Sequence, residues 1–90
     1  MLNTENTSKV SLPFTTTDDG KICYWAVEGS GEWGADNATG RGHADALIAD
    51  MKATDFPGTL AHVVHAMIDR GTFGGVEVGF LNQIAQRTLV

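Results

Sequence analysis

Apolar residues recur at spacings of three and four between residues 57 and 70, which is the period of one face of an α-helix. The apolar positions are Leu60, Val63, Val64, Met67 and Ile68. Pro57 suits the first turn of a helix, and Gly71 can adopt the left-handed conformation that ends one. The pattern therefore predicts a helix over residues 57–70, and we expect this helix to lie at the centre of the core.

Alternating apolar and polar residues near the start of the chain are typical of a β-strand with one buried face. Residues 10–15 carry this pattern, and Pro13 restricts the strand to the edge of a sheet. In residues 21–28 both alternating sets are apolar, as in a strand covered on both faces. With a short third strand over residues 32–35, the chain would form a small antiparallel meander of two or three strands over about residues 10–35.

Two further helices are predicted, one on each side of the helix over residues 57–70. They cover residues 43–54 and 76–88, because each segment places its apolar side chains on one face. Residues 76–80 also alternate in polarity, so a strand there is the alternative interpretation. The polar, glycine-rich residues 34–42 are expected to form a loop. The predicted fold class is α+β, with three helices packed on one face of the meander.

The length of 90 residues indicates a single domain over residues 10–90, preceded by a flexible polar arm over residues 1–9. No apolar run approaches the roughly 20 residues of a transmembrane helix, and no signal peptide is recognisable. The single cysteine excludes an intrachain disulfide and agrees with a reducing compartment. These features predict a cytoplasmic protein without membrane contact, and the compact, cysteine-poor chain suggests a bacterial source.

The formal net charge of −5 bears on the kind of partner. Binding to nucleic acid without sequence preference requires clustered Lys and Arg, whereas the six Lys and Arg residues of this chain occur singly. The composition therefore excludes that class of protein. Negative charge favours a partner with basic residues, although the same charge also keeps a small protein soluble.

Three side chains that can bind metals share one face of the helix over residues 57–70. His62, His65 and Asp69 are spaced by three and four residues. Two imidazoles at this spacing can bind zinc, copper or nickel, and the carboxylate adds an oxygen ligand. The same face is expected to lie in solvent, where these residues are ordinary polar surface and His65 forms a weak pair with Asp69. A metal site and a plain solvent-exposed face are therefore the two interpretations.

The residues just before the predicted helix over residues 43–54 form a candidate anion-binding site. They are Thr39, Gly40, Arg41, Gly42 and His43. Free backbone N–H groups at a helix N-terminus, with a guanidinium and an imidazole nearby, can hold a carboxylate or a phosphate. The structural alternative is that Thr39 or Asn37 caps the turn and Arg41 pairs with a surface carboxylate such as Asp45.

Other motifs give no support for catalysis. Glycines over residues 29–34 match the letters of a dinucleotide-binding loop, but eight residues separate them from the predicted helix and Glu32 would repel a phosphate. Cys23 is expected to be inert packing within a strand, and Glu77 is expected to cap the last helix. Since no catalytic triad is recognisable, we expect no enzymatic activity and no cofactor.

Two tryptophans have different expected environments. Trp25 is expected in the core, whereas Trp33, which lies between Glu32 and a glycine, is expected to be exposed. Exposed aromatic side chains often anchor protein interfaces. We therefore expect a small acidic accessory or regulatory module that acts by protein contact through Trp33 and Glu32, with a homodimer as one candidate. Binding of a small ligand or anion by residues 39–43, or of a metal at the histidine face, is the alternative.

Overall fold

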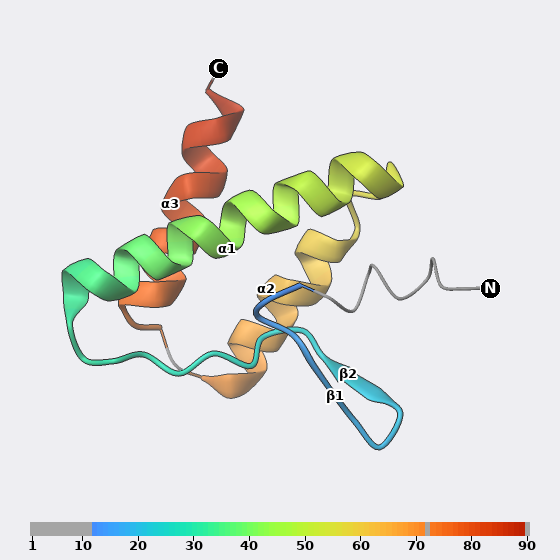
Figure 1. Cartoon of the computed structure of the whole chain (residues 1–90), viewed down its shortest axis with the longest axis horizontal. Coiled ribbons are helices and arrows are strands. Elements are labelled where there is room, and N and C mark those ends of the chain that lie inside the picture. Colours follow the sequence, from blue (N-terminus) through green and yellow to red (C-terminus); the bar gives the residue numbers. More distant parts are fainter. Residues whose placement is uncertain (1–11, 72, 90) are drawn as a thin grey trace.

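The computed structural model describes residues 12–71 and 73–89, and the predicted arm over residues 1–9 lies outside this part of the chain (Figure 1). A β-hairpin is followed by three helices, so the predicted α+β class is confirmed. The strands are β1 (Thr16–Asp18) and β2 (Lys21–Cys23), and the helices are α1 (Trp33–Thr54), α2 (Thr59–Arg70) and α3 (Gly75–Thr88). None of these helices is both long and apolar enough to cross a membrane.

The hairpin is antiparallel and ends in a tight turn. Thr17 lies opposite Ile22, and the turn residues Asp19 and Gly20 have φ values of 53° and 79°. Two positive φ values in succession match the twist of hairpin strands, which explains a glycine at the second position. All residues of both strands are exposed, and the hairpin projects from the body of the molecule (Figure 1).

Strand structure is shorter than the alternation of polarity predicts, and the first strand lies at Thr16–Asp18, after the predicted residues 10–15. Only the first three residues of the segment 21–28 form a strand, and the predicted strand over residues 32–35 is wrong because Trp33 begins α1. Cys23, expected to be packed inside a strand, is exposed. Beyond the hairpin the two segments still lie side by side, since the backbone N–H of Ala26 donates to the carbonyl oxygen of Phe14 at 2.8 Å.

Aromatic side chains that flank the hairpin form the centre of the core. The ring centroids of Phe14 and Trp25 are 5.4 Å apart, and the ring of Phe80 lies 5.0 Å from that of Trp25. All three side chains are almost completely inaccessible to solvent, which confirms the predicted burial of Trp25. The helices contribute the remaining fully buried apolar side chains, which are Ala44, Leu47, Val63, Met67 and Val76.

The helix predicted over residues 43–54 begins earlier, at Trp33, so the prediction of a loop over residues 34–42 is wrong. Each glycine in a helix interior costs about 1 kcal/mol relative to alanine, which is why this glycine-rich segment looks like a loop when it is considered alone. Gly40 is buried where α1 packs against α3, and this packing offsets the cost. Tertiary packing therefore outweighs local propensity here.

Helices α1 and α3 approach so closely that their contact requires glycine on both sides. A Cβ atom added to Gly40 would lie 2.7 Å from the backbone nitrogen of Phe80 and even closer to the carbonyl oxygen of Val76. On α3, a Cβ atom added to Gly79 would lie 2.8 Å from Cα of Asn37. Real Cβ atoms do not approach backbone atoms at such distances, so a side chain at either position would separate the helices.

The helix predicted over residues 57–70 is present as α2, but its expected place at the centre of the core is wrong. Val63 and Met67 are buried as predicted, whereas Ile68 is 61% exposed. Helix α1 packs mainly against α3 and makes few contacts with α2. The principal helix pair of the core is therefore α1 and α3.

Substitution of Gly40 by alanine is expected to lower the free energy of unfolding by about 2 kcal/mol, because overpacking against backbone atoms forces the helices apart. Gly42 is the matched control, since it is in the same helix and a Cβ atom there would meet nothing within 4 Å. Gly42→Ala is expected to raise the free energy of unfolding by about 0.5–1 kcal/mol. Urea denaturation measures both effects, and two changes of the same sign would contradict the proposed packing.

Candidate functional site

A groove of about 430 Å³ opens where the loop after the hairpin meets the first turns of α1 and α3. Its polar and aromatic lining residues are Glu28, Trp33, Asp36, Arg70 and Glu77. Backbone atoms of glycines in the loop and at the start of α3 complete the walls. This Trp33 groove combines an indole, three carboxylates and a guanidinium from segments that are far apart in the sequence.

Asp36 holds the loop before α1 in place. Its carboxylate oxygens accept hydrogen bonds from the backbone N–H and the hydroxyl of Ser30, at 2.8–3.0 Å, and from the backbone N–H of Gly31 at 3.2 Å. These bonds, above all the one from the Ser30 backbone, hold the pKa of Asp36 below its ordinary value. A carboxylate that keeps its charge in this way is a fixed structural anion, and it has little capacity to act as an acid.

Glu77 links the start of α3 to the core. One carboxylate oxygen accepts the backbone N–H of Gly74 at 2.8 Å, which confirms the predicted capping role. The other accepts the indole N–H of Trp25 at 2.7 Å, in a buried hydrogen bond. Glu77 is only 6% exposed, and each of its carboxylate oxygens accepts a hydrogen bond. The second bond was not predicted, because Trp25 and Glu77 are 52 residues apart.

Arg70 crosses one side of the Trp33 groove. Its guanidinium donates to the carbonyl oxygen of Trp25 at 3.2 Å and pairs with the carboxylate of Glu28 at 3.1 Å. The Glu28 side chain is 89% exposed, so this ion pair contributes little to stability and can rearrange when a ligand approaches. The guanidinium therefore lines the same groove as the Trp33 indole, and its side chain is partly exposed.

Trp33 lies in the first turn of α1 and not in a strand, which corrects its predicted setting. Its predicted exposure is confirmed, since the side chain is 60% exposed. Glu32, immediately before the helix, is also exposed. The sequence therefore identified the exposed Trp33, which lines this groove, and the exposed Glu32 next to it in the chain, although it gave both the wrong secondary structure.

The candidate anion site over residues 39–43 was predicted at a helix N-terminus, but the helix begins earlier, at Trp33. Thr39, Gly40, Arg41, Gly42 and His43 lie in the second and third turns of α1 and not before its first turn, so their N–H groups belong to the helix. Asp45 pairs with Arg87 at 3.1 Å and with Gln83 at 3.0 Å, and not with Arg41 as the structural alternative supposed. These bonds, led by the one from Gln83, lower the pKa of Asp45.

His43 packs against the aromatic core. Its ring centroid is 5.5 Å from that of Phe14 and 5.9 Å from that of Trp25. Burial disfavours the charged imidazolium and lowers the pKa of His43. The side chain is therefore half-buried against the aromatic core, where the charged form that would attract an anion is disfavoured.

The histidine face of α2 is exposed as predicted, but its three candidate metal ligands do not come together. His65 Nδ1 lies 3.5 Å from Asp69 Oδ2 as the expected weak pair, and both side chains are more than two-thirds exposed. The ring of His62 instead stacks on Tyr24, with centroids 4.9 Å apart and an interplanar angle of 16°. Within residues 12–71 and 73–89, no three His, Cys, Asp or Glu side chains are arranged to hold a metal ion.

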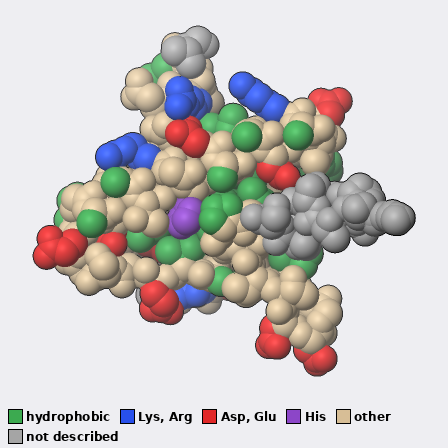
Figure 2. Space-filling model, viewed as in Figure 1, with side chains coloured by type: hydrophobic (Ala, Val, Ile, Leu, Met, Phe, Trp, Pro, Cys, Tyr) green, Lys and Arg blue, Asp and Glu red, His purple; other side chains and the backbone are tan. Residues whose placement is uncertain are grey.

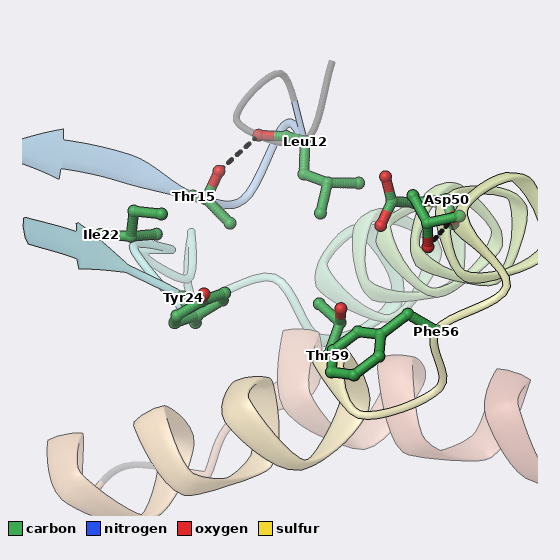
Figure 3. Close-up of a pocket in the computed structure, with 8 residues that line it drawn as sticks. Leu12, Thr15, Ile22, Tyr24, Asp50, Phe56 and Thr59 are labelled. Carbon is green, nitrogen blue, oxygen red and sulfur yellow. Dashed lines mark hydrogen bonds between the residues drawn. The ribbon is translucent and has the colours of Figure 1, made fainter. Parts of the chain in front are cut away.

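A second cavity, of about 180 Å³, lies between the hairpin and the connection from α1 to α2 (Figure 3). Its apolar walls are Leu12, Ile22, Tyr24 and Phe56, and Asp50 and Thr59 add polar groups. Sequence reasoning did not detect this cavity, because its residues come from four separate segments. No periodic pattern in the sequence links them.

Comparison of the chain with protein-family models, with curated proteins and with solved structures found no match. The proposal on function therefore rests on the geometry of the two cavities and on the charge around them.

The lowered pKa of His43 predicts a pH dependence of stability. Since the unfolded chain binds the proton more readily, stability is complete above the ordinary pKa of 6.5 and is lost as pH falls toward the folded value. Urea denaturation at about pH 7.5 and about pH 5.5 measures this loss. His43→Gln is expected to reduce the difference between the two pH values, whereas His65→Gln, at an exposed position, should leave it unchanged. An unchanged difference in His43→Gln would contradict the prediction.

Proposed function

We propose that this chain is a non-enzymatic accessory or regulatory protein that acts by contact with another protein, and that Trp33 anchors the contact. The observation that carries this proposal is an indole that is 60% exposed at the edge of the Trp33 groove. Aromatic side chains in such positions bury a large apolar area when a partner covers them, and they dominate the energetics of many interfaces.

The walls of the Trp33 groove are held in place before any partner binds. Asp36 secures the loop over residues 30–31, and Glu77 secures the start of α3. Binding to such prearranged walls costs less conformational entropy than binding to a mobile surface. The same hydrogen bonds occupy the carboxylate oxygens, which supports a role in contact rather than in acid–base catalysis.

The charge around Trp33 favours a basic partner segment. The exposed carboxylates of Glu28 and Glu32 lie on either side of the loop that leads to the indole. In Figure 2, acidic side chains stand out at the hairpin tip and at the end of the molecule where α1 begins. A lysine or arginine of the partner would interact with the face of the indole and with these carboxylates.

We assign this contact to the cytoplasm of a bacterium. The thiol of Cys23 is free and exposed, and an exposed thiol is maintained most readily in a reducing compartment. The net charge of −5 keeps a protein with exposed apolar side chains soluble until it meets its partner.

A photo-crosslinking residue placed at position 33 in cells of the native host tests the proposed contact. Ile68 is the matched control position, since its side chain is 61% exposed on α2 and does not line the Trp33 groove. Crosslinking at position 33 and not at position 68 is expected, and mass spectrometry identifies the captured protein. For that protein, Trp33→Ala should weaken binding by about 2 kcal/mol or more.

Because exposed charges are screened by salt, binding of the captured protein should also weaken as ionic strength rises. Ile68→Ala should bind like the unmodified protein. Equal capture at positions 33 and 68, or equal affinities of the two alanine variants, would contradict the role of Trp33.

A homodimer is the second candidate, because two large apolar side chains at this end of the chain are exposed, Leu81 on α3 at 39% and Leu89 just after α3 at 80%. Burying them in a second copy would give a small domain extra stability. We expect light scattering at micromolar concentration to give the mass of two chains, and Leu81→Ser to shift it toward one. A single-chain mass for the unmodified protein would exclude self-association under these conditions.

A further inference from the structure

The cavity between the hairpin and the connection from α1 to α2, which we call the Asp50 pocket, combines apolar walls with one carboxylate. Leu12, Ile22, Tyr24 and Phe56 form the walls, and Asp50 of α1 adds the negative charge. Figure 3 shows the Asp50 carboxylate pointing into the space between Leu12 and Phe56. The pocket is therefore complementary to a ligand that is apolar at one end and positively charged at the other.

The Asp50 carboxylate has no hydrogen bond or ion pair to residues 12–71 or 73–89. The three ion pairs of this part of the chain involve Asp45, Asp69 and Glu28. The hydroxyl of Thr54 donates to the backbone carbonyl oxygen of Asp50 and not to its side chain. A half-buried carboxylate that is unpaired within residues 12–71 and 73–89 can accept hydrogen bonds from an incoming cation, and charge-assisted hydrogen bonds are among the strongest a ligand can make.

Two aromatic walls of the pocket lie against neighbouring residues. Tyr24 stacks on the ring of His62, with an interplanar angle of 16°. The ring of Phe56 covers Gly58 so closely that a Cβ atom there would lie 2.6 Å from the ring. Stacking on His62 restricts the Tyr24 ring, so little conformational entropy is lost at this wall when a ligand binds.

The volume limits the ligand to a single small group. A cavity of about 180 Å³ is only slightly larger than the roughly 150 Å³ cavity that is known to hold one benzene ring. A phenyl ring or a short alkyl chain therefore fills the apolar part and leaves the charged end at the carboxylate. Nucleotides and other large or anionic ligands do not match this volume and charge.

We infer that the Asp50 pocket binds an organic ammonium ion with one apolar substituent, either as a free amine or as a lysine side chain of another protein. The ammonium group donates hydrogen bonds to Asp50, and the apolar substituent packs between Tyr24 and Phe56. Asp50 and Trp33 are 17 residues apart on α1, about 25 Å along the helix axis. This site is therefore independent of the proposed contact at Trp33.

Titration of the full chain with 2-phenylethylammonium, followed by backbone amide NMR shifts, tests the inference. We expect a Kd on the order of 1 mM and shifts concentrated at residues 22–24, 50 and 54–59. The neutral analogue 2-phenylethanol has the same shape and should bind about tenfold more weakly, because it lacks the charge. Equal affinity for the two compounds, or shifts centred elsewhere, would overturn the inference.

Variants separate the two parts of the pocket. Asp50→Asn should weaken binding of the amine about tenfold and remove its advantage over the alcohol. Asp69→Asn is the matched control, because it removes the same charge from an exposed position outside the pocket, and it should leave the affinity unchanged. Gly58→Ala should displace the Phe56 ring and weaken both compounds together. Equal effects of the two aspartate variants would exclude a specific role for Asp50.

A peptide distinguishes the two sources of the ammonium group. Acetyl-Ala-Lys-Ala-amide carries a lysine side chain with blocked ends, so binding at the same residues with loss in Asp50→Asn would assign the pocket to a lysine of a protein. Binding of 2-phenylethylammonium without binding of the peptide would assign it to a free amine. Failure of both probes would overturn the inference and would leave the proposed function of Trp33 unaffected.

Discussion

The close contact between α1 and α3 is the constraint on which the rest of the structure depends. Gly40 and Gly79 allow the two backbones to meet, and even one methyl group at either position would contact backbone atoms of the other helix. This approach puts the first turns of both helices beside the loop over residues 28–31. It also explains why a segment with three glycines is helical, because packing stabilises it more than the glycines destabilise it.

Two buried carboxylates complete this arrangement. Asp36 binds the loop before α1, and Glu77 binds both the start of α3 and the indole of Trp25. Through the Trp25 bond, the segment after the hairpin is attached to α3, so the aromatic core and the helix pair support each other. Buried carboxylates often indicate a reactive site, but here every oxygen accepts a hydrogen bond from a loop, a helix end or the core. Their hydrogen bonds account for the position of the loop and for the shape of the groove.

The two cavities lie near opposite ends of α1 and have different chemical character. The Trp33 groove presents a protruding indole with an acidic surround, which suits a surface that covers it. The Asp50 pocket is smaller and concave, and its charge lies at one end of an apolar space, which suits an inserted group. Carboxylates outnumber cationic side chains in the lining of both cavities, in line with the net charge of −5. Both proposed sites would therefore recognise a cationic group, one at a surface contact and the other in a cavity.

The sequence by itself determined which segments are helical after residue 43, the burial of Trp25, the exposure of Trp33 and the exposed face of α2 that carries His62. These properties follow from the residue type at each position and from the spacing of apolar residues nearby in the sequence. Only the tertiary structure decided where α1 begins, which helices form the main pair and where the cavities lie. The start of α1 depends on Gly40 meeting a helix that begins 35 residues later at Gly75, and the Asp50 pocket depends on Leu12, Ile22 and Phe56 converging from distant positions. Such contacts between distant residues set packing energies that exceed local preference, so no local pattern in the sequence can reveal them.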